Sequence, residues 1–338
     1  MKKVLTAALI VLVLSTVCVF ADAKGVQKGY VIALSNSFYG NSWRKQMVDC
    51  FTKSAMQAKA AGRISDFIIV NGDGTQNTQI SQLNSLILSD VDAICINAAS
   101  PTALNGVIEK AIKKGIKVIT FDSIVTQPDA YKMDFDFYGQ GKTIAKYCVD
   151  RFKGKANVLF VRGIRGSDPE IQLYNGAMSV LKANPGMKVV AEADGEADAA
   201  ISQSAVSNIL PSLNNIDVAI TTGGEYGVVQ AFEAAGRKVP VIIGSNRSEF
   251  IKWWIDEKAK NGYETVSISS EPSIGSVVVW LAIHILEGDK VPNSIKLNSI
   301  LVTNKTVDQY KDLLPGTVIA QDYDEQFVID MLKNLNNR

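Results

Sequence analysis

Short apolar runs alternate with helix-like segments along almost the whole chain, at a spacing of about 25 residues. The first runs have strand-like composition, and the segments between them carry apolar residues at helical spacing. The runs are Val31–Leu34, Phe67–Val70, Ala93–Ile96 and Lys117–Phe121, and the helical segments are Arg44–Ala60, Gln76–Ser89 and Thr102–Lys114. This alternation predicts an α/β fold in which helices cover both faces of a parallel sheet.

The stretch Ser123–Phe137 interrupts this rhythm, because it holds a proline and three aspartates without a clear period. We interpret it as the first passage between two lobes. A second α/β set follows, with strands expected at Asn157–Arg162, Lys188–Ala191, Asp217–Thr221, Val239–Ile243 and Thr265–Ser270. Its helices are expected at Tyr138–Phe152, Glu170–Ala183, Ser202–Leu210, Tyr226–Ala235, Ser248–Lys260 and Ser273–Leu286. An extended piece near Lys296–Val302 and helix signals at Val307–Leu313 and Glu325–Leu335 complete the chain.

The N-terminal residues are typical of an export signal. Two lysines precede the apolar run Val4–Phe20, and Ala21-Asp22-Ala23 supplies a small-residue cleavage pattern. We therefore expect residues 1–23 to be removed and the mature protein to be periplasmic or otherwise extracytoplasmic. The alternatives are an uncleaved anchor, for which the run is short, and lipid attachment at Cys18, where the preceding valine is bulkier than usual.

Charge and residue usage restrict the possible functions. The formal net charge of +1 gives no electrostatic reason to expect nucleic acid as a partner. The single histidine, His284, lies in the apolar run Val277–Leu286 and is expected in the core, so it provides neither a multi-histidine metal site nor a catalytic base. Gly141-Lys142-Thr143 lacks the first glycine of a phosphate-binding loop. We expect no enzyme activity, no metal and no cofactor.

Three cysteines remain after the expected cleavage: Cys50, Cys95 and Cys148. Each lies in an expected helix or strand and is interpreted as a small buried apolar residue. A disulfide between two of them stays open as an alternative.

Polar side chains follow many of the expected strands, and parallel strands present these ends to one edge of a sheet. Two such edges facing each other would form a cleft suited to a neutral, hydroxyl-rich molecule. The residues so placed are Ser35, Asn36, Asn71, Asp73, Asn97, Asp122, Gly163–Glu170, Thr222–Glu225 and Ser245–Arg247. For each of these amide residues taken alone, the alternative to ligand binding is a structural role in a turn or helix cap. For Phe38, Tyr39 and Trp43 the alternative is packing in the core.

Five motifs together carry a resemblance that covers nearly everything after the expected signal peptide. They are YVIALSNSFYGNSW, DAICINAASPTAL (Asp92–Leu104), KGIKVITFDS (Lys114–Ser123), VIIGSN (Val241–Asn246) and SSEPSIGS (Ser269–Ser276). As a set they resemble the periplasmic solute-binding proteins of ABC sugar transporters, of the ribose/galactose-binding type. The resemblance implies two Rossmann-like lobes with parallel sheets, joined by three hinge crossings and closing on a sugar.

On this resemblance the N-terminal lobe is expected to comprise residues 24–134 plus about 271–297, and the C-terminal lobe residues 135–270 plus about 298–338. The chain departs from the family pattern at Leu173, where the family usually carries arginine, and at Gly223-Gly224, where it carries an Asn-Asp pair. We therefore expect a polyol, a furanose or a modified sugar rather than a common pentose or hexose.

The matching motifs imply a set of ligand-binding residues, with Asp122 as a hydroxyl acceptor and Arg44 reaching the ligand from a helix start. Glu170, Gln172 and Glu225 are expected to replace the missing polar contacts. The full expected set is Asn36, Phe38, Tyr39, Trp43, Arg44, Asn97, Asp122, Glu170, Gln172, Glu225, Asn246, Ser270 and Glu271.

The expected function is that of an exported monomer that captures a sugar or polyol and delivers it to an ABC transporter permease. A sugar sensor for a chemoreceptor or kinase is an alternative, as is a sugar-modifying enzyme on the same fold. A transcriptional regulator with this two-lobed sensor would need a DNA-binding helix-turn-helix at the N-terminus, where this chain carries an export signal instead.

Overall fold

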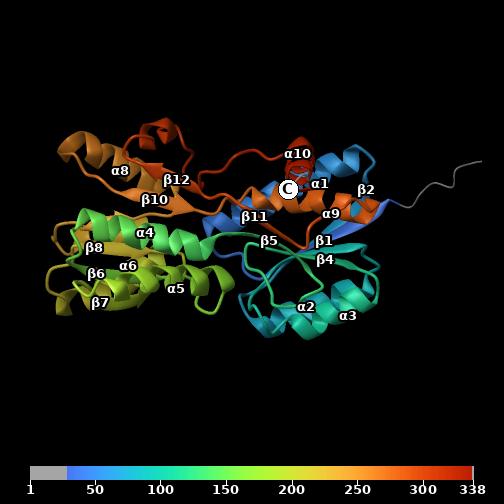
Figure 1. The fold of residues 1–338 in the computed structure, drawn as a ribbon, viewed down its shortest axis with the longest axis horizontal. Helices are drawn as coiled ribbons and strands as arrows, with labels where there is room; N and C mark the ends of the chain where they lie inside the picture. The colour runs from blue at the N-terminus through green and yellow to red at the C-terminus, as the bar shows by residue number, and fades with distance from the viewer. Residues whose placement is uncertain (1–28, 337–338) are drawn as a thin grey trace, which may run out of the picture.

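The computed structural model describes residues 29–336, so the expected signal peptide and Cys18 lie outside the described residues. The chain forms two α/β lobes that lie side by side and are connected near the middle of the molecule (Figure 1). Within residues 29–336, every helix is too short or too polar to cross a lipid bilayer.

The first lobe is built on a six-stranded parallel sheet of order β11-β5-β4-β3-β1-β2. Its inner strands are buried on both faces: in β1, Ile32 and Leu34 join one apolar cluster while Ala33 joins another. Such strands are continuous apolar runs, which is why the sequence revealed most of them. The strands are β1 (Tyr30–Asn36), β2 (Ile64–Asn71), β3 (Ala93–Asn97), β4 (Lys117–Phe121), β5 (Tyr131–Phe135) and β11 (Ser294–Leu297).

Two helices cover each face of this sheet (Figure 1). One face carries α1 (Ser42–Ala60) and α9 (Ile274–Glu287), and the other carries α2 (Gln76–Leu88) and α3 (Asn105–Lys113). Gly275 of α9 lets the two helices on the first face approach closely, because an added Cβ would lie 2.2 Å from the Met47 carbonyl oxygen.

The second lobe holds a four-stranded parallel sheet of order β7-β6-β8-β9. A bridge between Gly244 and Ser267 continues it into β10, which pairs antiparallel with β12. The strands are β6 (Ala156–Arg162), β7 (Met187–Asp194), β8 (Val218–Thr221), β9 (Val241–Ile243), β10 (Val266–Ser269) and β12 (Ile300–Thr303). The helices are α4 (Phe137–Arg151), α5 (Asp168–Ala183), α6 (Ala199–Ile209), α7 (Glu225–Ala234) and α8 (Ser248–Asn261), with short 3₁₀ turns at Leu210–Ser212 and Val307–Tyr310.

Before its C-terminal tail, the chain passes between the lobes at three adjacent places, from β5 to α4, from β10 to α9 and from β11 to β12. This is the α/β fold with two parallel-sheet lobes and three hinge crossings that the resemblance implied. Because these passages run through short extended segments, each can bend by changing a few backbone dihedrals.

Two expectations need correction. The stretch Ser123–Phe137 was expected to be only a passage, but it contains β5, an inner strand of the first sheet. The extended piece near Lys296–Val302 is two strands in different lobes, β11 and β12.

The C-terminal tail also differs from the expected domain division, which assigned residues 298–338 to the second lobe. Helix α10 (Glu325–Asn336) packs against α9 of the first lobe and buries Val328 and Leu332 there. Arg63 binds both Glu287 of α9 and Glu325 of α10, which fixes the helix in place. For the other segments we propose the predicted boundaries.

His284, Cys95 and Cys148 are buried as the sequence indicated, whereas the expectation of a buried Cys50 is wrong, because that residue is only partly buried. Cys50, Cys95 and Cys148 are unpaired thiols, and Cys95 and Cys148 are fully buried. His284 is 7% exposed, and its Nδ1 lies 2.6 Å from the carboxylate of Asp289.

Candidate functional site

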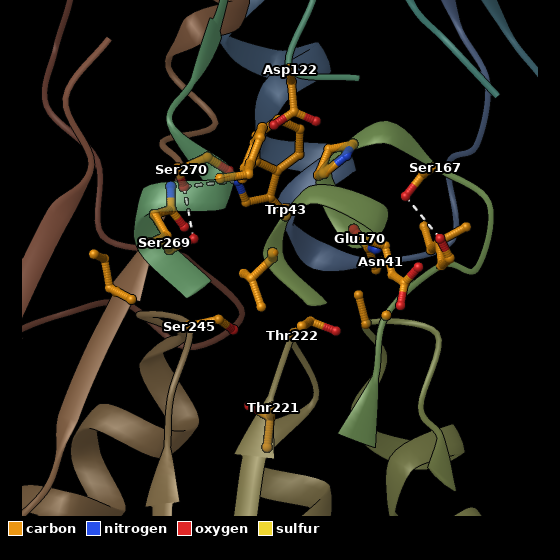
Figure 2. A pocket seen from close by; sticks show the side chains of 18 of the residues that line it. Asn41, Trp43, Asp122, Ser167, Glu170, Thr221, Thr222, Ser245, Ser269 and Ser270 are labelled. Atoms are coloured by element: carbon orange, nitrogen blue, oxygen red, sulfur yellow. Dashed lines mark hydrogen bonds between the residues drawn. The ribbon is translucent and has the colours of Figure 1, made fainter. Parts of the chain in front are cut away.

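A cavity of about 120 Å³ lies between the two lobes. Figure 2 shows side chains entering it from α1 and the end of β4 on one side, and from the strand ends of the second sheet on the other. From the first lobe come Asn41, Trp43, Arg44 and Asp122, and from the end of β10 and the hinge that follows it come Ile268, Ser269 and Ser270. From the second lobe come Phe137, Gln140, Gly163, Ile164, Ser167, Pro169, Glu170, Leu173, Ala197, Thr221, Thr222, Ser245 and Arg247.

The first turn of α1 builds one wall of the cavity. Asn41 caps the helix, its side chain accepting a hydrogen bond of 2.9 Å from the backbone N–H of Arg44. The indole of Trp43 donates to the Ser270 carbonyl oxygen at 3.1 Å, which ties the helix start to the hinge. The Arg44 guanidinium donates a hydrogen bond to Asn36 Oδ1 at 3.0 Å, so Asn36, which does not line the cavity itself, fixes the orientation of Arg44. Capping therefore positions two cavity side chains.

Asp122 follows β4 and is 5% exposed, with a left-handed backbone φ of 56°. Its carboxylate accepts a hydrogen bond of 3.2 Å from Asn97 Nδ2. Burial raises the pKa of Asp122 to about 6, because lost hydration outweighs the opposing charge of Arg44. Burial also lowers the pKa of Arg44, and Asp122 opposes that shift. The first-lobe wall therefore carries a coupled buried acid and base.

Glu170 enters the second-lobe wall from the first turn of α5 and is nearly fully buried. It pairs with Arg162, which also donates to Glu192 at 3.0 Å. The Arg162 guanidinium lies 3.4 Å from the ring centroid of Tyr174, a cation–π arrangement. The charge of Glu170 is thus balanced within the second lobe, and one turn further along Leu173 presents an apolar surface to the cavity.

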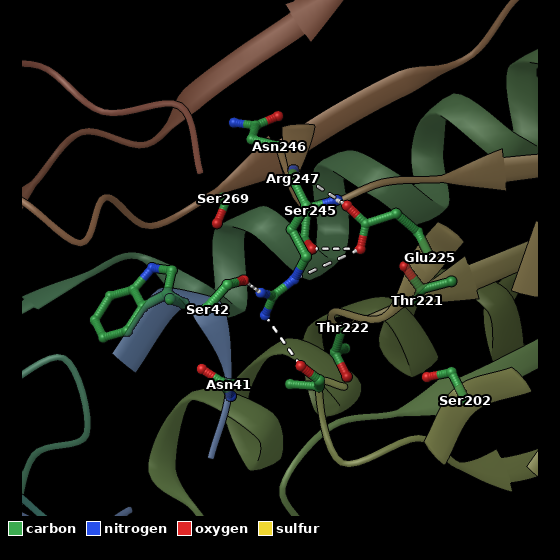
Figure 3. A network of polar contacts seen from close by, with 12 residues as sticks. Asn41, Ser42, Ser202, Thr221, Thr222, Glu225, Ser245, Asn246, Arg247 and Ser269 are labelled. Carbon is green, nitrogen blue, oxygen red and sulfur yellow. Dashed lines mark hydrogen bonds and ion pairs between the residues drawn. The ribbon is translucent and has the colours of Figure 1, made fainter. Parts of the chain in front are cut away.

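Arg247 is held in a polar network that Figure 3 shows between the lobes. The fully buried Glu225 accepts from Ser245 N at 2.9 Å, from Ser245 Oγ at 2.7 Å and from the backbone N of Arg247 at 3.3 Å. The Arg247 guanidinium donates to the Ala197 carbonyl at 3.0 Å and to Ser42 Oγ of the first lobe. Its Nε lacks a hydrogen-bond partner among the described residues and lies 3.9 Å from the Glu225 carboxylate, an ion-pair distance.

Five of the thirteen expected site residues line the cavity: Trp43, Arg44, Asp122, Glu170 and Ser270. Three others, Asn36, Asn97 and Glu225, stand directly behind the wall and bind Arg44, Asp122 and the Arg247 loop, respectively. Buried polar groups of this kind hold the cavity side chains in position.

The remaining five lie away from the wall. Gln172 donates to Asp168 at 2.7 Å, and Asn246 donates to the Ile300 carbonyl at 2.8 Å. Glu271 accepts from Gln321 N and Tyr323 OH, which fixes the tail to the hinge. Phe38 bridges to Asp73 at the edge of the first lobe, and Tyr39 is 39% exposed outside the cavity lining.

The sequence set omitted several lining residues, among them Asn41, Phe137, Gln140, Thr222 and Arg247. Arg247 and Thr222 did stand in the loops after expected strands, so that signal was present for them. Phe137 and Gln140 lie in the first turn of the helix that follows the first hinge crossing. Their position directly after a predicted crossing was the available signal for them.

Comparison with known proteins gives a consistent result. Residues 32–290 match the family described as periplasmic binding protein domain. A solved structure, an ABC transporter solute binding protein from Thermobispora bispora, is 35% identical, with a TM-score of 0.86 over 91% of this chain and 96% of that one.

Two curated proteins are more distant. The ribose import binding protein RbsB of Bacillus subtilis is 24% identical over 285 residues, which is 83% of this chain and 90% of that protein. The xylitol-binding protein of Mycolicibacterium smegmatis is 28% identical over 197 residues, and that match spans 57% of this chain and 56% of the relative.

Proposed function

The chain belongs to the periplasmic binding protein domain family, and from that premise we propose that it captures a sugar or polyol between its lobes and delivers it to an ABC transporter permease. The observation that carries this proposal is the convergence of hydrogen-bonding side chains from both lobes on one cavity. Arg44 and Asp122 enter from one side, and Glu170 and Arg247 from the other. A ligand bound there contacts both lobes and favours their closure.

The chemistry of the cavity suits a neutral guest. Glu170 is paired with Arg162, Asp122 lies opposite Arg44, and Arg247 lies close to Glu225, so neither sign of charge dominates. Hydroxyl groups donate to carboxylates and accept from guanidinium groups, while apolar side chains cover C–H surfaces. A polyhydroxy compound satisfies these groups without adding an unpaired charge.

The volume of the cavity and the side chains of its second-lobe wall favour a small or modified compound. The cavity of about 120 Å³ lies below the roughly 300–1,000 Å³ typical of pockets for drug-sized molecules. Leu173 and the Gly223-Gly224 turn offer no hydrogen-bonding side chains on that side. We therefore propose a polyol, a furanose or a modified sugar, and the relative that is named for xylitol supports this class.

Two further parts of the proposal concern location and partners. Curated relatives are named as periplasmic binding proteins, and we propose that the mature chain works outside the cytoplasm as a monomer. We propose binding without chemical change to the ligand, which incubation with the bound sugar and product analysis would test.

A thermal-shift screen tests the proposed function. Purified protein is heated with pentoses, hexoses, furanoses and polyols, and we expect at least one of these classes to raise the melting temperature. Arg44→Ala and Asp122→Ala should abolish that rise, because each removes a buried hydrogen-bonding partner of the ligand. Circular dichroism should show that both variants remain folded.

The matched control for this screen is Arg165→Ala, because Arg165 is half exposed, pairs with Asp194 and does not line the cavity. Its ligand response should equal that of the wild type. An undiminished response in Arg44→Ala and Asp122→Ala would contradict the site assignment, and no response to any polyhydroxy compound would contradict the function.

A further inference from the structure

One face of α1 binds the second lobe at two places that lie one helical turn apart. Ser42 Oγ accepts a hydrogen bond from Arg247, as Figure 3 shows. Gln46 makes a double contact: its Nε2 donates to the Val318 carbonyl at 3.0 Å, and its Oε1 accepts from the Val318 N–H at 2.8 Å. Residues four apart share a helix face, so the two contacts form one stripe.

Val318 is attached to the second lobe by backbone hydrogen bonds. It forms an antiparallel bridge with Arg247, Ser248 N donates to the Thr317 carbonyl at 2.9 Å, and Ile319 N donates to the Asn246 carbonyl at 3.0 Å. Gln46 therefore binds the segment that backs the loop carrying Arg247. A contact between Gln46 and Val318 joins the lobes themselves.

The segment 316–323, which we term the strap, leads from this bridge to the hinge. Beyond Ile319 the strap binds Glu271. The Glu271 carboxylate accepts hydrogen bonds from Gln321 N at 2.7 Å and from Tyr323 OH at 2.8 Å. The strap is thus fixed to the second lobe at one end and to the hinge at the other. A rotation that separates the lobes must move Val318 relative to α1.

Neither Gln46 nor Val318 lines the cavity. Their two hydrogen bonds therefore need no contact with the ligand. Opening the lobes would replace both hydrogen bonds by hydrogen bonds to water. The net free-energy cost is that of losing two hydrogen bonds between neutral groups. The contact acts on the equilibrium between open and closed lobes and leaves the choice of ligand to the cavity side chains.

We propose that Gln46 and the strap form a latch that populates the closed arrangement before ligand binds, and that Gln46 is accordingly a positioning residue for binding. Affinity scales with the fraction of molecules that are already closed. The affinity part of this inference rests on the proposed function; the effect on the ligand-free protein does not.

The test compares Gln46→Met with the wild type and with Gln57→Met. Methionine keeps the length of glutamine and removes both hydrogen bonds to Val318. Gln57 is exposed and lies on the same face of α1 three turns further on, so it is the matched control. Small-angle scattering of the ligand-free full chain should give a larger radius of gyration for Gln46→Met than for the wild type and Gln57→Met.

Titration calorimetry with two polyols, xylitol and myo-inositol, gives the second measurement. Gln46→Met should bind either compound about 5- to 30-fold more weakly than the wild type, by the same factor for both, since two hydrogen bonds are lost away from the ligand. Gln57→Met should bind like the wild type.

Two results would overturn the latch: equal radii of gyration for Gln46→Met and the wild type, or a loss of affinity for one compound alone. If neither compound binds the wild type, the proposed function loses support, and the ligand-free scattering comparison still decides the latch. Matching thermal unfolding curves establish that all three proteins are folded.

Discussion

Asp122 combines features that are unusual for an aspartate. It is buried, its backbone φ of 56° lies in the left-handed region, and Asn97 donates to its carboxylate. Burial raises its pKa to about 6, above the value of an exposed aspartate. The folded protein therefore holds a proton there at pH values at which the unfolded chain has released it. Stability falls as the pH rises through this window, from about 4 to about 6.

This reasoning predicts the behaviour of Asp122→Asn. The amide cannot titrate, so the variant should lack the share of the pH dependence that Asp122 contributes. Between pH 4 and pH 6 the wild type should lose roughly 2–3 kcal/mol of unfolding free energy relative to the variant. Urea denaturation at closely spaced pH values measures this. Parallel curves for the two proteins would show that Asp122 does not carry the shift.

At the scale of elements, the crossing of α4 and α5 positions four cavity residues. Gly141 of α4 and Gly176 of α5 let the helices touch: a Cβ on Gly176 would lie 2.1 Å from the Tyr138 carbonyl oxygen. The first turns of these helices supply Phe137, Gln140 and Glu170, and Leu173 lies one turn further along α5. Close packing therefore fixes the second-lobe wall, because interiors deform little around an added atom.

A pair of glycine substitutions tests this crossing. Gly176→Ala should destabilise the protein by about 2–4 kcal/mol, because the methyl group meets backbone that cannot move aside. Gly106→Ala is the control, since Gly106 lies in α3 with open space around it and should be neutral or stabilising by up to about 1 kcal/mol. Equal unfolding midpoints for the two variants in urea would refute the proposed close contact.

At the scale of the molecule, the tail adds a fourth passage between the lobes. It leaves β12 in the second lobe, follows the strap past the hinge and ends as α10 on α9 (Figure 1). Arg63 is shared by Glu287 and Glu325, and Val328 and Leu332 are buried. The last helix of the chain is therefore part of the first lobe's surface layer.

Removing α10 tests this arrangement. A chain that ends after Asp324 exposes apolar surface of α9, and we expect a loss of about 2–4 kcal/mol of unfolding free energy from the burial of Val328 and Leu332. Chemical denaturation monitored by tryptophan fluorescence measures it. An unchanged midpoint would mean that α10 contributes nothing to the first lobe.

The sequence by itself determined most of the strands and helices, the two-lobed class and part of the cavity. Lys117–Phe121 was predicted with the bounds of β4, because a strand buried on both faces leaves a continuous apolar run that needs no distant partner to be recognised. β5 escaped notice since its Lys132 and Asp134 break the run, and Asp134 is balanced by Lys296 of β11, far along the chain.

Only the tertiary structure decided which polar residues reach the cavity and which stand behind it. Asn36 and Arg44 are both predicted to bind the ligand, yet Asn36 holds Arg44 in place. Arg247 meets Ser42, and Gln46 meets Val318, across hundreds of residues of sequence. Apolar periodicity is a local property of the chain, whereas the partner of a hydrogen-bonding group depends on how distant elements pack.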